Sequence, residues 1–191
     1  MSIGSMINIT EFTKTYDKKV IHFKTLSINH KVTIFIGENG SGKSTILKAI
    51  VDLISYQGNI NSDFTYSYMP EHPAFPINIT VKQFLLNLYQ IFKNDYDYHC
   101  LLTDYGLETR LNDEINTLSK GMKAKLNLIQ CLMRNTDVYI LDEPLGGLDD
   151  QSVKKLIKYI KNSPKNYIIS THIKDAFQDL DKEVIYINEV S

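Results

Sequence analysis

An eight-residue stretch at positions 37–44, GENGSGKS, combines glycines with a lysine and a serine at a spacing suited to binding phosphate. Glycines let the backbone wrap closely around phosphate oxygens, in conformations that a Cβ atom would forbid. The backbone amides and the start of a following helix supply positive potential to a β-phosphate. Lys43 would reach the β- and γ-phosphates, and the Ser44 hydroxyl would face Mg²⁺. The alternative is a glycine-rich turn without a ligand.

Two adjacent carboxylates, Asp142 and Glu143, follow an apolar run at 138–141 that has the composition of a buried strand. Parallel sheets hold their ligands at the carboxyl ends of their strands, where these acids would lie. Neighbouring side chains of a strand point to opposite faces, so the two acids would do different work. Asp142 suits the coordination shell of Mg²⁺, and Glu143 suits a base that polarises an attacking water. Alone, the pair could be two solvated acids, but beside a phosphate loop that alternative is disfavoured.

One histidine, His172, follows another apolar strand pattern at 167–171. At the same edge of the sheet, its ring could contact a γ-phosphate or hold the attacking water. The alternative is a surface histidine, which is our interpretation of His22, His30 and His99.

A second candidate for binding phosphate is the sequence LSKGM at 118–122, which opens a helix. Apolar residues recur at helical spacing over 122–133, so the helix itself is expected. Its first turn offers the Ser119 hydroxyl and the bare amide of Gly121 at a helix N-terminus, an arrangement that favours anions.

These residues need a scaffold that brings distant segments together. Strand patterns occur at 7–10, 20–23, 25–28, 32–36, 138–141, 167–171 and 184–187. Helix patterns occur at 44–54, 81–92, 98–105, 122–133, 151–160 and 173–180. Strands that alternate with helices predict an α/β fold with a mainly parallel sheet, and about 76–118 reads as an inserted helical segment.

Composition narrows the class of protein. A chain of 191 residues is about one domain, and we expect a single domain over 1–191. A net charge of -1 gives no reason to expect nucleic acid as a partner. The chain holds no apolar run of about 18 residues, so direct membrane insertion is not expected. Cys100 and Cys131 lack metal-site spacing and are expected to be reduced thiols. The first residues do not form a signal peptide, and because Met6 could begin the protein, residues 1–5 could be an extension.

Taken together, the motifs resemble those of the nucleotide-binding domain of ATP-binding-cassette (ABC) ATPases, in the family's order and over nearly the whole chain. GENGSGKS corresponds to the Walker A motif, YMPEHP (68–73) to the Q-loop, LSKGM to the signature, VYILDEP (138–144) to Walker B, GGLD (146–149) to the D-loop and STH (170–172) to the switch histidine. The resemblance implies a P-loop NTPase fold, α/β, with an N-terminal antiparallel β subdomain and a short α-helical subdomain inserted.

The resemblance also implies the function and its partners. The chain would be the ATP-binding and ATP-hydrolysing subunit of an ABC transporter, a Mg²⁺-dependent ATPase that drives a separately encoded membrane permease. Two cassettes, as a homodimer or heterodimer, would pack head to tail around two ATP molecules. The loop YMPEHPAFPINITV resembles that of bacterial exporters. The expected location is cytoplasmic, on the inner face of the cell membrane through the permease.

Site residues follow by position. The residues expected to act in catalysis are Glu143, His172 and Lys43. Those expected to bind nucleotide are Tyr16, Gly37, Asn39, Gly40, Ser41, Gly42, Lys43, Ser44 and Thr45, with Ser119 and Gly121 facing the partner's ATP. Those expected around the metal are Ser44, Asp142 and Glu71. Tyr16 would stack on adenine, or it could be a plain β-hairpin residue.

Three residues depart from the family's pattern. Lys120 replaces the first signature glycine and either adds positive charge or points to solvent. Met122 replaces the signature glutamine. Glu71 stands where the Q-loop glutamine is expected, and could contact Mg²⁺ or the attacking water through an oxygen.

Three other functions compete with transport. A small ABC ATPase that transports nothing and a slow-hydrolysing regulatory module share the motifs, although Glu143 and His172 argue against the regulator. A different P-loop enzyme, such as a nucleotide kinase, would explain GENGSGKS but not LSKGM, GGLD and STH in this order.

Overall fold

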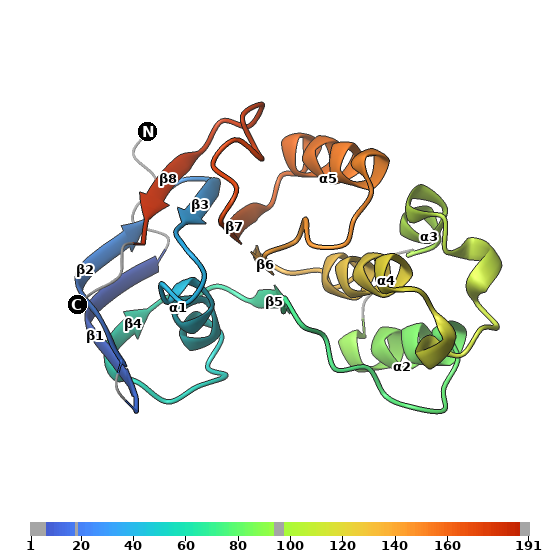
Figure 1. Ribbon diagram of the computed structural model, residues 1–191, viewed down its shortest axis with the longest axis horizontal. Helices are drawn as coiled ribbons and strands as arrows, with labels where there is room; N and C mark the ends of the chain where they lie inside the picture. The colour runs from blue at the N-terminus through green and yellow to red at the C-terminus, as the bar shows by residue number, and fades with distance from the viewer. Residues whose placement is uncertain (1–6, 18, 94–97, 188–191) are drawn as a thin grey trace.

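A parallel sheet lies at the centre of the molecule (Figure 1). The computed structural model describes residues 7–17, 19–93 and 98–187, so residues 1–5 lie outside it. The strands of this sheet are β3 (Val32–Ile36), β5 (Tyr66–Met69), β6 (Val138–Asp142), β7 (Asn166–Thr171) and β8 (Glu183–Tyr186), in the order β5-β6-β7-β3-β8. All of their pairings are parallel, which confirms the fold class.

An antiparallel sheet forms the second layer, with β1 (Ile7–Tyr16) between β2 (Lys19–Ile28) and β4 (Gln57–Asn61). The three short strands predicted before position 29 are in fact two long ones, paired from Ile7 opposite Ile28 to Tyr16 opposite Lys19. The predictions also missed β4 and β5. Strand β4 is polar and mostly exposed, and β5 has only four residues, so neither carries a strong apolar signal.

The helices are α1 (Lys43–Ile50), α2 (Val81–Phe92), α3 (His99–Tyr105), α4 (Lys120–Leu132) and α5 (Asp150–Asn162), with 3-10 turns η1 (Glu108–Arg110) and η2 (Ile115–Thr117). Helix α2 begins as its sequence predicts, because Thr80 and Gln83 form a reciprocal capping box. Between β5 and α4 the elements are helical, and the boundaries 76–118 of an inserted subdomain stay a prediction. Cys100 lies exposed in α3 and Cys131 buried in α4, both as free thiols.

Two helix predictions were wrong. The segment 173–180 forms successive turns, in which Ala176 N–H donates to Ile173 O and Leu180 N–H to Phe177 O. The ammonium of Lys182 donates a hydrogen bond to the carbonyl of Phe177 at 2.7 Å. In a continuing helix this carbonyl would instead accept from a backbone N–H. Helix α1 ends at Ile50 rather than at 54, because Asp52 adopts a left-handed conformation with φ of 56°.

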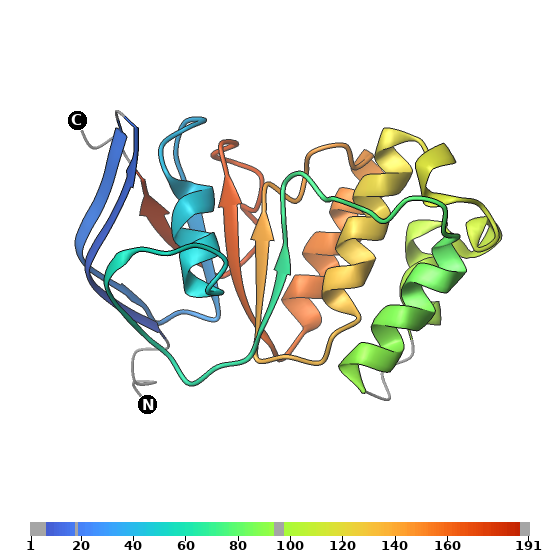
Figure 2. The ribbon, with the colours of Figure 1, turned by 90° about the horizontal axis from the view of Figure 1, so that it is seen from below.

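Layers follow one another across the molecule in Figure 2: the antiparallel sheet, α1, strands β7, β6 and β5 of the parallel sheet, α4 with α5, and α2. Each face of the parallel sheet has its own apolar core. The first core joins it to α1 and the antiparallel sheet, and the second joins it to the remaining helices. Strands β3 and β6 are buried along their whole length, which explains why their residues are apolar apart from Thr33 and Asp142. Among the described residues, no helix combines the length and the apolar content that crossing a bilayer requires.

Parallel pairing brings the carboxyl ends of the central strands to one edge. Ile36 pairs with Thr171, and Asp142 pairs with Ser170. The chain therefore leaves β3, β6 and β7 at neighbouring points, and the loops that follow them meet there.

Leu85→Ala should lower the free energy of unfolding by about 2–5 kcal/mol, because Leu85 is fully buried in the second core and its removal leaves a cavity. The matched control is Leu86→Ala on the same helix, where the side chain is 40% exposed and the loss should be about 1 kcal/mol or less. Urea unfolding followed by circular dichroism measures both. Equal losses would mean that α2 does not pack through this face.

Candidate functional site

The phosphate loop runs from the end of β3 into α1. Its last glycine, Gly42, is the N-cap of α1 with φ of 106°, and a Cβ there would lie 3.0 Å from carbons of Ile21. At Gly37, a Cβ would lie 2.3 Å from the carbonyl oxygen of Ile187. Both glycines are therefore required by close packing around the loop, which leaves the backbone amides at the start of α1 able to face an anion.

Lys43 lies under this loop with 4% of its side chain exposed. Its ammonium donates to the carbonyl of Gly37 at 2.7 Å and to that of Glu38 at 3.1 Å. The Oε1 atom of Glu143 is 3.4 Å away. A buried cation held by two carbonyls and one carboxylate can bind phosphate oxygens without first being stripped of bulk water.

Asp142 is buried, with 1% of its surface exposed, and three hydroxyl groups donate to it. Ser44 Oγ lies 2.9 Å and Ser170 Oγ 2.5 Å from Oδ1, and Tyr68 OH lies 3.0 Å from Oδ2. Burial and the charge of Asp142 raise the pKa of Tyr68 well above its usual range, so the phenol stays a donor. None of these hydroxyls is charged, and the oxygens of Ser44 and Asp142 are ligands that Mg²⁺ prefers. The residues present therefore fit this metal.

Glu143 begins the turn after β6 with φ of 48°, a left-handed conformation that is costly for a residue other than glycine. Ser170 stabilises it, because the Glu143 N–H donates to its carbonyl at 3.2 Å and its hydroxyl at 3.0 Å. The carboxylate is 11% exposed, and its Oε2 lies 3.0 Å from Nδ1 of His172. Lys43, Glu143 and His172 thus form a continuous chain of charged and polar groups.

A cavity of about 360 Å³ opens over the loop and collects most of the predicted nucleotide-binding residues. It is lined by Tyr16, Lys19, Ile21, Asn39, Gly40, Gly42, Lys43, Ser44, Thr45, Glu71 and Glu143. Tyr16 is also the last residue of β1, opposite Lys19, so it is a hairpin residue as well as part of the cavity wall. A neighbouring cavity of about 600 Å³ brings Gly37, Asn39 and Ser41 together with His172.

The signature residues lie elsewhere. Within the described part of the chain, the residues lining the cavity over Lys43 include neither Ser119 nor Gly121. Ser119 caps α4, its hydroxyl accepting from Met122 N–H at 3.2 Å, and a Cβ on Gly121 would lie 3.2 Å from Gly147 O. Lys120 lines a separate cavity of about 360 Å³ with Glu71 and Glu143. The loop at 37–44 and the turn at 118–122 of one chain therefore do not line the same cavity.

Helix α4 contacts the segment that follows Glu143 through an ion pair at the surface. Lys125 of α4 pairs with Asp149, the N-cap of α5, at 2.7 Å. The hydrogen bond from Lys125, with that from Ser152, holds the pKa of Asp149 well below its usual range.

Lys19 and Ile21 of the cavity wall were not predicted from the sequence, and neither were two of the donors to Asp142, Tyr68 and Ser170. These two donors lie inside motifs that the sequence analysis named, YMPEHP and STH, but neither was assigned a role. Tyr68 and Asp142 are 74 positions apart, and Ser170 and Asp142 are 28 apart. Only the order and register of β5, β6 and β7 bring them together.

Comparisons with known proteins agree with this geometry. Residues 24–146 match the model of the family described as ABC transporter. The chain is 34% identical to the ABC transporter ATP-binding protein YthP of Bacillus subtilis (strain 168), covering 76% of this chain and 66% of that protein. It is 34% identical to the cytochrome c biogenesis ATP-binding export protein CcmA of Reclinomonas americana, covering 90% and 88%. It is 30% identical to the zinc import ATP-binding protein ZnuC of Ehrlichia canis (strain Jake), covering 96% and 81%.

The fold is also shared with solved structures. An ATP-binding subunit of an ABC transporter superposes with a TM-score of 0.85 at 22% identity, over 98% of this chain and 89% of that one. The family match covers more than half of the chain, and its relatives carry the same ATP-binding assignment. The chain belongs to the ATP-binding subunits of the ABC transporter family.

Proposed function

We propose that the chain hydrolyses ATP with Mg²⁺ and drives a separately encoded membrane permease. The observation that carries the proposal is the placement of Glu143 between Lys43 and His172, beside the Ser44–Asp142 pair. Lys43 would bind the β- and γ-phosphates, and Tyr16 would lie against the adenine. Mg²⁺, held by Ser44 and Asp142 with Glu71 nearby, would neutralise charge on the phosphate oxygens.

Glu143 is assigned as the general base. Its Oε2 is hydrogen-bonded to His172 at 3.0 Å, whereas its Oε1 lies 3.4 Å from the Lys43 ammonium and has no hydrogen-bond partner among the described residues. Oε1 is therefore available to accept a proton from water. A carboxylate accepts hydrogen bonds, so Nδ1 of His172 is the donor to it. In a neutral imidazole Nε2 is then an acceptor, so we assign it to a hydrogen of the attacking water, since the oxygens of a γ-phosphate cannot donate to it.

Two copies are proposed to complete each site. Ser119 and Gly121 offer a capped helix N-terminus that lies outside the cavity over Lys43. In a head-to-tail dimer, homomeric or heteromeric, they would face the γ-phosphate bound by the partner. Lys120, next to them, would add positive charge there.

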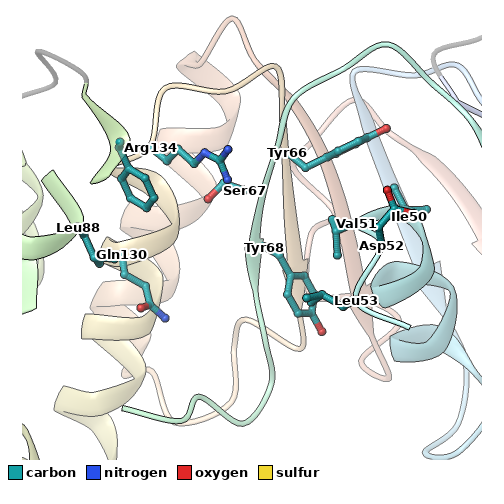
Figure 3. Close-up of a pocket in the computed structure, with 11 residues that line it drawn as sticks. Ile50, Val51, Asp52, Leu53, Tyr66, Ser67, Tyr68, Leu88, Gln130 and Arg134 are labelled. Atoms are coloured by element: carbon teal, nitrogen blue, oxygen red, sulfur yellow. The ribbon is translucent and has the colours of Figure 1, made fainter. Parts of the chain in front are cut away.

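A groove on another side of the molecule suits a docking permease (Figure 3). Its volume is about 510 Å³, and it lies between the end of α1, strand β5 and helices α2 and α4. Its walls are Ile50, Val51, Asp52, Leu53, Tyr66, Ser67, Tyr68, Leu88, Phe92, Gln130 and Arg134. Walls that combine aliphatic and aromatic side chains with an acid, an amide and an arginine suit an amphipathic cytoplasmic segment of a permease, which would hold the chain at the inner face of the membrane.

The direction of transport is a separate question. The loop at 68–81 predicts export, whereas the relatives include a protein named for export and others named for zinc import. Both kinds match most of this chain, 90% and 96%. Export therefore stays a prediction, and the permease is the subunit that would decide it.

Glu143→Gln should lower ATP hydrolysis by roughly 10²-fold or more, because the amide cannot accept the proton of water. Phosphate release under saturating Mg²⁺ and ATP measures it. The same variant should form an ATP-dependent dimer on size-exclusion chromatography, because the nucleotide persists. Unchanged turnover would remove Glu143 from the role of base.

Ser119→Arg should abolish hydrolysis while the monomer still binds ATP, because the bulky cation blocks the partner's site and leaves the cavity over Lys43 intact. Binding of a fluorescent ATP analogue and phosphate release separate the two effects. Asn116→Arg, at an exposed position of η2, is the control for an added arginine. Loss of ATP binding by the monomeric Ser119→Arg chain would place Ser119 in its own chain's site and contradict the shared-site proposal.

A further inference from the structure

Tyr68 takes part in two features of the molecule at once. Its hydroxyl donates to Oδ2 of Asp142 at 3.0 Å. Its side chain also lines the groove between α1, β5, α2 and α4 that Figure 3 shows. A single side chain therefore connects the wall of this groove to the carboxylate assigned to Mg²⁺.

Of the two groups joined by this hydrogen bond, Tyr68 is the one that can be displaced from the groove. Strand β5 is at the edge of the parallel sheet, and among the described residues it pairs only with β6, so no described strand covers the groove side of β5. The Asp142 carboxylate, in contrast, is constrained, because it is buried and Ser44 and Ser170 also donate hydrogen bonds to it. Displacing the Tyr68 ring from the groove side would thus alter the hydrogen bond to Oδ2 of Asp142, while the hydrogen bonds from Ser44 and Ser170 to Oδ1 remain.

We propose that Tyr68 is a positioning residue that links occupancy of the groove to the metal carboxylate Asp142. An occupant that moves the ring changes the hydrogen bond at Oδ2, and with it how firmly Asp142 is oriented for Mg²⁺. Hydrogen-bond partners of metal-binding carboxylates act in this way in other metal sites. The inference rests on the proposed function, which supplies the metal at Asp142 and the partner in the groove.

Tyr66 is the matched comparison on the same strand. It lines the same groove, but its hydroxyl donates to Ser62 Oγ at 2.5 Å instead of to Asp142. Removing either hydroxyl with phenylalanine keeps the ring in the groove wall. Only Tyr68→Phe removes a donor from the metal carboxylate, so a difference between the two variants reports the link rather than the packing.

The first test measures Mn²⁺ binding in the presence of ATP by electron paramagnetic resonance of the full chain. Tyr68→Phe should weaken Mn²⁺ binding roughly tenfold, the usual effect of removing such a partner. Its ATP binding in EDTA should match the wild type, because Lys43 and the phosphate loop are unchanged. Tyr66→Phe should leave both affinities unchanged. Equal Mn²⁺ affinities in Tyr68→Phe and wild type would overturn the inference.

The second test places a probe in the groove. Leu53 lines the groove and is 60% exposed, so Leu53→Cys can carry a bulky maleimide label once exposed Cys100 is replaced by serine. Cys131 is buried, and burial raises the pKa of its thiol to about 12, so it should not react. The label should change Mn²⁺ affinity when Tyr68 is present and have no effect in the chain carrying Tyr68→Phe. An equal response in both chains, or none in either, would contradict the coupling.

Different results would contradict the proposed function and the link through Tyr68. A wild-type chain that bound neither ATP nor Mn²⁺ would contradict the proposed function. A wild-type chain that bound both, without any effect of Tyr68→Phe, would contradict only the link through Tyr68. Circular dichroism of each variant shows whether the fold is retained.

Discussion

The burial of one negative charge, that of Asp142, shapes much of this structure. An ionised carboxylate removed from water is stable only if other groups replace its hydration. Here the donors come from three different elements: Ser44 from α1, Ser170 from β7 and Tyr68 from β5. Satisfying this carboxylate therefore fixes the start of α1 and two strands relative to β6. The three hydroxyl donors leave the charge itself uncompensated, which is why the proposed function places Mg²⁺ beside this carboxylate.

The sequence predicted best those elements whose residues are buried on both sides. Strands β3, β6 and β7 are almost fully buried and mostly apolar in their central residues, so their composition is sufficient. Helix α2 is buried on one face only, and its apolar stripe predicts it. The polar strand β4 depends on its neighbour β1 and was missed. The segment 173–180 has helix-like spacing, but backbone bonds and Lys182 direct it into turns. Tertiary contacts decide these cases, and a single sequence does not contain them in readable form.

The same division applies to the candidate site. Gly42, Lys43 and Ser44 were assigned from a motif whose spacing directly reflects its chemistry. Asp142 and Glu143 followed from their place at a strand end. Tyr68 and Ser170 contribute through strand order alone. Likewise, no local sequence pattern predicts the ion pair between Lys125 of α4 and Asp149, which follows Glu143 in the chain.

Glu143 illustrates a conflict between stability and chemical reach. Its left-handed φ of 48° would be easier for glycine, asparagine or aspartate than for glutamate. Each of these replacements would relax the backbone, but glycine has no acid, asparagine no charge, and aspartate a side chain one methylene shorter. The position therefore bears an unfavourable conformation because only a long carboxylate spans from this turn to Lys43 and His172. Thermostabilised variants of this chain should be sought elsewhere, since the most direct gain in stability at position 143 removes the group that defines the site.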